Sequence, residues 1–303
     1  MNILMENLDG GGDVWWCASA RRRSAHFSAG AHGPRVRGVV QFRVGAAGKY
    51  RRGLLLFRGY QAELRARHPC RGERSLPSRG RRPRFQPEDK NSRKKWARRL
   101  VETGVAVLRF DKRGVGDSDG EYRRGYADFE LLSGDLVSAV DFVANDPRVD
   151  IDRIRLLGSR QAGWILPMVA TRSPHVAFVI LLSGPTVTGA QHNYWDEIAD
   201  DESLTIDQLT AMLADFVPPA GDHDPRLFLE AMTMPALWML GREDRIIASP
   251  RSAEILEEIV AEFQRPFTVI MYENAGHGLR DVESNDRIPY WDDLLPWLEG
   301  VIR

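Results

Sequence analysis

Two residues of this chain combine the types and the placement needed for acid–base chemistry. His277 stands between two glycines, after the apolar run 267–272, and Asp244 follows the apolar run 236–240. An imidazole can act as a general base, and a carboxylate can hold that imidazole in the required tautomer. No other histidine has a comparable context, and none forms a metal-ligand spacing. These other histidines are His26, His32, His68, His175, His192 and His223.

The elements that must position these residues are short apolar runs that alternate with helical patterns. The runs predict strands at 105–110, 154–157, 178–182, 236–240 and 267–272. The helical spacing of apolar residues predicts helices at 88–103, 128–145, 161–171, 252–263 and 290–302. Such alternation predicts an α/β fold with a mostly parallel sheet covered by helices on both faces. Further upstream, residues 39–44 and 54–57 also suit strands.

Several segments, in order, resemble the α/β-hydrolase superfamily. Residues 111–118 are similar to its "D-x-R-G-x-G-x-S" loop, and the pieces 146–150 and 181–185 add to the likeness. The resemblance covers about two thirds of the chain and is strongest to the esterase and dipeptidyl-peptidase-like branch. It implies an α/β-hydrolase fold with a short helical lid at 186–232, Asp244 as the acid of a catalytic triad and His277 as its base.

The nucleophile position of that triad is occupied by an arginine. The family's nucleophile elbow has small residues on either side of the nucleophile, and here Gly158 and Ala162 bracket Arg160. A guanidinium stays protonated and has no lone pair with which to attack. Ser159 is the fallback nucleophile, but it stands one residue early. An error of about 1 Å in placement already costs about 10²-fold in rate.

The resemblance also implies two backbone N–H donors for an oxyanion hole. The first is Gln161, directly after the elbow position. The second is Tyr60, because residues 57–60 resemble the family's "V-H-G-x" loop. Arg58 replaces the histidine of that loop, and the sequence after Tyr60 does not match the family.

The chain has no net charge overall, but its first 100 residues are basic and the remainder is acidic. Residues 1–100 hold 24 Lys+Arg and 7 Asp+Glu, whereas residues 101–303 hold 18 and 35. We expect a poorly ordered segment at 1–35 and a hydrolase domain at 36–303. Within the domain, residues 61–87 form an Arg-, Pro- and Gly-rich stretch without apolar periodicity. This stretch reads as a disordered basic loop, as the product of a local reading-frame error, or as a functional basic arm.

Composition narrows the class of protein. The 43% hydrophobic and 28% charged residues are ordinary for a soluble globular chain. Two cysteines favour a reducing, cytoplasmic compartment. No apolar run has the ~20 residues of a membrane span, no signal peptide is recognisable, and no cofactor motif is found. The oligomeric state and the exact substrate are open.

Three functional hypotheses follow. The first is an ester or amide hydrolase of the Ser-Asp-His type that Arg160 has impaired. The second is a pseudoenzyme that binds an anionic small molecule through Arg160. The third is a scaffold that a basic arm tethers to nucleic acid, which the scarcity of aromatic residues in 61–87 disfavours.

Overall fold

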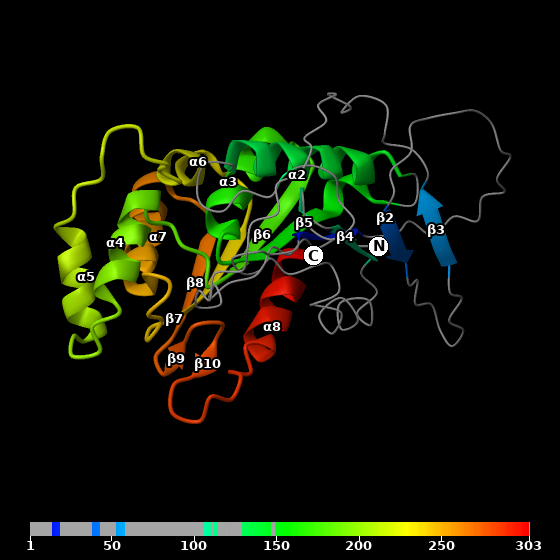
Figure 1. Cartoon of the computed structure of the whole chain (residues 1–303). Helices are drawn as coiled ribbons and strands as arrows, with labels where there is room; N and C mark the ends of the chain where they lie inside the picture. Colours follow the sequence, from blue (N-terminus) through cyan, green and yellow to red (C-terminus); the bar gives the residue numbers. More distant parts are fainter. Residues whose placement is uncertain are drawn as a thin grey trace, which may run out of the picture.

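The computed structural model describes residues 14–18, 38–42, 53–57, 106–110, 112–113, 121, 129–146 and 149–302. These residues form a six-stranded sheet in the order β4-β1-β5-β6-β7-β8 (Figure 1). The strands are β1 Val14–Ala18, β4 Ala106–Phe110, β5 Ile154–Ser159, β6 Val176–Leu182, β7 Ala236–Gly241 and β8 Phe267–Tyr272. β5 to β8 are parallel, and β1 runs antiparallel to both β4 and β5. The expected mostly parallel sheet is confirmed.

Helices lie on both faces of the sheet (Figure 1). The long ones are α2 Phe129–Ala144, α3 Ala162–Arg172, α7 Ser249–Phe263 and α8 Trp291–Ile302. α2 and α3 pack together on one face, while α8 lies on the other. The Trp297 ring of α8 meets the Phe178 ring of β6 edge-on at 5.3 Å, and its Nε1 donates to Thr268 Oγ1. Helices on both faces explain why the central strands are apolar on both sides.

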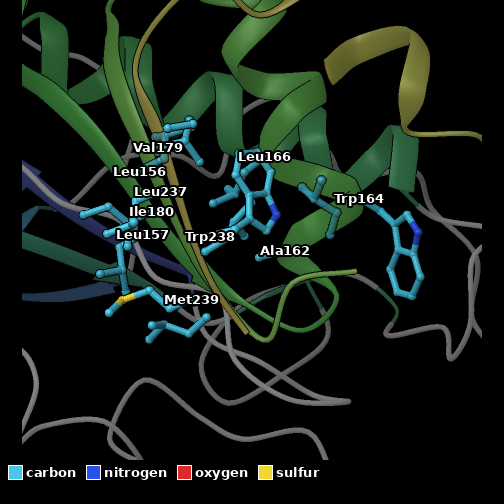
Figure 2. Packing of buried hydrophobic residues seen from close by; sticks show 14 of the residues in the cluster. Leu156, Leu157, Ala162, Trp164, Leu166, Val179, Ile180, Leu237, Trp238 and Met239 are labelled. Carbon is cyan, nitrogen blue, oxygen red and sulfur yellow. The ribbon is translucent and has the colours of Figure 1, made fainter. Parts of the chain in front are cut away.

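The core lies between these layers, and strand parity decides which side chains enter which half (Figure 2). Side chains alternate between the faces of a strand, so residues in register across β5, β6 and β7 share a face. Leu156, Val179 and Trp238 lie on the α3 side, where Trp238 is fully buried against the helix. Leu157 and Met239 lie on the opposite side. This parity also fixes the direction of Ser159, discussed below.

The first three strands differ from expectation. The expected strand at 54–57 is present as β3, Gly53–Phe57, but it pairs with β2, Gly38–Phe42, in a separate two-stranded sheet. β1 takes the place beside β5, although it lies in the segment 1–35 that we expected to be poorly ordered. Its sequence, Val-Trp-Trp-Cys-Ala, is rich in residues with high strand propensity. Residues 61–87 and the helix expected at 88–103 lie outside the described residues.

The insertion after β6, expected as a short helical lid, contains three short helices. They are α4 Gly189–Ile198, α5 Ile206–Ala214 and α6 Arg226–Ala231. Thr188 and Gln191 form a capping box that starts α4, and Thr205 and Gln208 form another that starts α5. We call α4, α5 and the residues that join them the cap. Within the described part of the chain, no helix is long and apolar enough to span a membrane.

Three minor elements complete the description. A 3-10 turn, Ile151–Arg153, leads into β5. The two-residue strands β9, Ala275–Gly276, and β10, Arg280–Asp281, pair with each other around the loop that holds His277. The 3-10 turn lies at the amino end of β5, whereas β9 and β10 follow the carboxyl end of β8, on the edge of the sheet where the candidate site lies.

Candidate active site

The turn between β5 and α3 has the backbone of a nucleophile elbow, with Arg160 at its apex. Arg160 has φ of +50°, in the left-handed region that non-glycine residues rarely adopt. Its N–H donates to Leu182 O at 3.2 Å, and its carbonyl accepts the N–H of Gly163 at 2.8 Å. Holding a non-glycine residue there costs about 1–3 kcal/mol. The surrounding contacts therefore impose the turn on the arginine.

Small residues after the apex are required by close packing. Ala162 is fully buried, and a Cβ added to Gly163 would lie 2.3 Å from the carbonyl oxygen of Pro185. The two small residues let α3 start directly against the loop that follows β6. This contact explains the small residues of the sequence motif in terms of space.

Ser159, the fallback nucleophile, is the last residue of β5 and not the apex of the turn. It is opposite Leu182 in the sheet and is 4% exposed. Strand parity directs its side chain to the face away from α3, together with Leu157. Its Oγ has no hydrogen-bond partner among the described residues. The geometry therefore places Arg160, and not Ser159, at the apex of the turn.

Asp244 lies in the loop after β7 and is completely buried. Its Oδ1 accepts hydrogen bonds from the backbone N–H groups of Ile246 and Ile247, each at 2.9 Å. Gly241 brings this loop against β9, because a Cβ there would meet Ala275 O at 2.4 Å. The N–H of Glu243 in turn donates to Ala275 O at 2.9 Å. The loop of Asp244 and the loop of His277 are thus joined through their backbones.

His277 and Asp244 are in direct contact. His277 Nδ1 lies 3.0 Å from Asp244 Oδ1 and 2.9 Å from Oδ2. If Nδ1 carries the proton and donates it to the carboxylate, Nε2 is left as the acceptor, which is the arrangement of a general base. Nε2 is buried and has no hydrogen-bond partner among the residues that the structure describes. The pair is therefore assembled, with the basic nitrogen unused by those residues.

Of the two expected oxyanion donors, the structure describes Gln161 but not Tyr60. Gln161 is the N-cap residue of α3, so its backbone N–H is at the helix start, as expected for the first donor. Its side-chain Oε1 accepts a 2.6 Å hydrogen bond from Nζ of the buried Lys112. Tyr60, the second expected donor, lies outside the described residues. The strand that precedes it, β3, is not paired with β5 in the main sheet. Tyr60 as the second donor therefore stays a prediction.

One histidine that sequence reasoning set aside lies within electrostatic reach of the pair. His192 on α4 packs edge-on against Trp164, with ring centroids 5.0 Å apart. Burial lowers the pKa of His192 to about 4, and the charges of Asp244 and His277 also act on it. No sequence pattern points to His192, because its distance from the pair depends on how the cap folds.

Ser183 is a second residue that sequence reasoning missed. It follows β6, next to Arg160 across the strands, and it also has a left-handed φ, of +48°. Its N–H donates to Met239 O at 2.9 Å, and it is 1% exposed. Two neighbouring parallel strands therefore end in left-handed residues at the edge where the candidate site lies. No pattern in the sequence predicted this strain at a serine.

The sheet, the helical insertion after β6 and the order elbow, acid, histidine are those of an α/β-hydrolase. Residues 137–281 match the family model described as "BAAT / Acyl-CoA thioester hydrolase C terminal". That span runs from within α2 to β10 and includes Arg160, Asp244 and His277. This match covers slightly less than half of the chain, and together with the observed sheet it supports an α/β-hydrolase fold. A search of curated proteins finds no match.

Several solved structures are similar to the chain at low sequence identity. Dipeptidyl peptidase 4 from Porphyromonas gingivalis is 17% identical with a TM-score of 0.49, over 68% of this chain and 28% of that one. Acetyl xylan esterase 1 from Thermoanaerobacterium sp. is 17% identical with a TM-score of 0.48, over 71% and 72%. An esterase from Pyrococcus furiosus is 15% identical with a TM-score of 0.46, over 67% and 73%. The chain thus spans only 28% of the length of the dipeptidyl peptidase.

Proposed function

We propose that this chain is a hydrolase of carboxylic esters, thioesters or amides whose acyl-transfer step is impaired by Arg160. The single observation that carries the proposal is the left-handed arginine at the apex of an otherwise complete elbow, in a chain whose His277 and Asp244 are in contact. The description of the matched family model favours thioesters among these substrates.

The chemistry of the impaired step follows from the residues. In an intact triad, a hydroxyl at the apex attacks the acyl carbonyl and passes its proton to Nε2 of the histidine, while the aspartate stabilises the imidazolium. The nascent oxyanion would accept the backbone N–H of Gln161, the residue after the apex. Arg160 can neither supply a nucleophilic lone pair nor give up a proton near neutral pH. Loss of the nucleophile leaves at most about 10³–10⁴-fold acceleration over water.

The test compares three variants of the full chain. Arg160→Ser restores a hydroxyl, and Arg160→Ala removes the guanidinium without adding a nucleophile. The double variant Arg160→Ser/His277→Ala removes the base. Hydrolysis of p-nitrophenyl butyrate and of butyryl-CoA is measured for each, beside the parent chain.

We expect turnover with Arg160→Ser alone, with kcat exceeding that of Arg160→Ala by at least about 10²-fold. Parent-chain turnover at the level of Arg160→Ser, with a requirement for His277, would contradict the impairment and point to another nucleophile. A chain that stays inactive with Arg160→Ser, although folded, would overturn the hydrolase proposal itself.

A second candidate function is binding of an anionic small molecule at Arg160. The observation that favours it is the position of the guanidinium residue at the start of the 11-residue helix α3, where backbone N–H groups and the helix dipole favour negative charge. Calorimetric titration with butyrate tests it. Binding that Arg160→Ala abolishes and that occurs without turnover supports this candidate, and no heat with the parent chain rejects it.

The nucleic-acid scaffold stays a prediction of the sequence. Its basic stretch, 61–87, lies outside the described residues. It would require DNA or RNA binding that weakens steeply with salt.

A further inference from the structure

The loop that holds Asp244 also holds the cap. Arg245, the residue after Asp244, extends its guanidinium to three backbone carbonyls of the segment between α4 and α5. Its Nη1 donates to Ala199 O at 3.1 Å and to Asp201 O at 3.2 Å, and its Nη2 donates to Leu204 O at 2.6 Å. One side chain therefore donates hydrogen bonds to three carbonyl groups of the connection between α4 and α5.

The Asp201 carbonyl also accepts the N–H of Leu204 at 3.2 Å, whereas the described residues offer the Ala199 and Leu204 carbonyls no other backbone donor. Ala199 is the C-cap residue of α4, and the last carbonyls of a helix have no partner within the helix. A guanidinium near a helix C-terminus is also favoured by the helix dipole. A planar guanidinium carries five N–H donors in a fixed fork, so it can reach several carbonyls at once, which a lysine ammonium on a flexible stem cannot do as well.

A second arginine of the same loop reinforces this connection. Arg242 donates to Asp207 Oδ1 of α5 at 2.7 Å and lies 3.6 Å from Glu273. The Asp207 carboxylate is 76% exposed, so this ion pair contributes little by itself. Arg245, whose partners are backbone carbonyls, is therefore the stronger of these two connections.

The connection also bears on the catalytic pair. The N–H groups of Ile246 and Ile247, directly after Arg245, hold the Asp244 carboxylate, and the same carboxylate meets His277. A shift of Arg245 would change the backbone that aims Asp244. In the cap, α4 carries His192, and the charges of Asp244 and His277 affect the pKa of this histidine.

We propose that Arg245 is a positioning residue that fastens the cap to the loop of Asp244 and thereby aligns Asp244 with His277. The fastening itself is independent of the reaction, whereas its effect on turnover rests on the proposed function. Arg245 touches neither the apex of the elbow nor His277 through any described contact, so it acts through the backbone of its neighbours.

The experiment compares Arg245→Ala and Arg245→Lys with the matched control Arg251→Ala. Arg251 is also a partly buried arginine of this region, but it pairs only with Glu254 and Glu258 of its own helix α7. Two readouts need no activity. The first is amide hydrogen exchange of Ala199 and Leu204, and the second is the downfield NMR signal of the His277 Nδ1–H bonded to Asp244.

With Arg245→Ala we expect exchange of these two amides to accelerate about 10-fold or more, because local opening becomes easier. We also expect the His277 signal to broaden or shift, while Arg251→Ala leaves both unchanged. Arg245→Lys should recover part of the protection, and it keeps the proposal testable if Arg245→Ala does not fold. Unchanged exchange and an unchanged His277 signal in folded Arg245→Ala, or in Arg245→Lys if only that variant folds, would overturn the proposal.

The catalytic consequence is measured in the Arg160→Ser background. There Arg245→Ala should lower kcat by about 10-fold, because misplacement of a catalytic group by a fraction of an ångström is costly, and Arg251→Ala should not. If Arg160→Ser itself is inactive, the proposed function has failed, but hydrogen exchange and NMR still decide whether Arg245 fastens the cap.

Discussion

Gly163 lies so close to Pro185 that a Cβ at Gly163 would come within 2.3 Å of the Pro185 carbonyl oxygen. This contact seats the first turn of α3 against the loop after β6. It allows the chain to leave β5 through a left-handed apex and enter the helix at once. The elbow thus depends on backbone packing as much as on the residue at its apex.

Gly163→Ala is expected to destabilise the fold by about 1–3 kcal/mol, because backbone on both sides of the contact must shift. Gly134→Ala is the matched control, since Gly134 is also helical but has no atom within 4 Å of an added Cβ. That change should stabilise by about 0.5–1 kcal/mol through helix propensity. Urea unfolding of both variants measures the difference. Equal free energies of unfolding would mean that the contact with Pro185 is not tight.

Ser159→Ala is expected to leave stability unchanged within about 0.5 kcal/mol or to raise it. The buried Ser159 hydroxyl has no partner among the described residues, so removing it removes a desolvated polar group. Ser252→Ala is the contrast, because the buried Ser252 Oγ accepts the N–H of Thr186 at 3.1 Å. Leaving that N–H unsatisfied should cost about 1–3 kcal/mol.

The same Ser159→Ala variant tests the fallback nucleophile. Any esterase activity of the parent chain should survive the change, because the side chain points to the face of the sheet away from α3. Loss of activity in a variant that still melts normally would return Ser159 to the nucleophile role.

Acidification should destabilise the protein through His192. Burial lowers the pKa of His192 to about 4, whereas an unfolded histidine has a pKa near 6.5. Between these two pH values, the His192 imidazole binds a proton in the unfolded chain but stays neutral in the folded chain. The stability present above pH 6.5 is therefore lost as the pH falls through 4, by about 3 kcal/mol in all.

Free energies of unfolding measured from pH 7 to pH 4.5 check this prediction. His192→Gln should flatten the dependence on pH, whatever it does to the absolute value. His223, whose pKa burial also lowers, leaves part of the slope in place. His175→Gln, in the turn between α3 and β6, serves as the control. A slope that His192→Gln does not reduce would show that His192 titrates normally in the fold.

Asp244→Asn in the Arg160→Ser background is expected to lower kcat by about 10²–10⁴-fold with little effect on stability. The amide oxygen of asparagine can still accept the N–H groups of Ile246 and Ile247. Its NH₂ group, however, would face His277 Nδ1 and favour the tautomer with the proton on Nε2, which cannot act as a base. Asp207→Asn is the exposed control, and undiminished turnover in Asp244→Asn would remove Asp244 from the proposed mechanism.

Much of this architecture could be predicted from the sequence, because the relevant signals are local. The strand at 267–272 was predicted with its observed bounds, and the strand at 236–240 lacked only Gly241. Since the carboxyl ends of parallel strands share one edge of a sheet, the loops after β7 and β8 had to bring Asp244 near His277. The predicted helix 252–263 began three residues late, because Ser249 and Pro250 are tolerated in a first helical turn.

What could not be predicted depends on contacts between distant segments. No local signal says that β1 lies between β4 and β5 or that β3 pairs with β2 instead. The reach of Arg245 to carbonyls more than 40 residues earlier is equally invisible in the sequence. His192 was set aside for the same reason, because only the folded cap brings it near the pair.

The left-handed backbone at Arg160 has a consequence for protein engineering. Backbone contacts of Arg160 with Leu182 and Gly163 hold the turn with a large cation at its apex, so the turn accommodates a long side chain there. Position 160 is therefore suited to substitution by other reactive side chains, such as a cysteine or a noncanonical nucleophile. Each would sit at the start of α3, in a chain that already carries a preassembled histidine–aspartate pair.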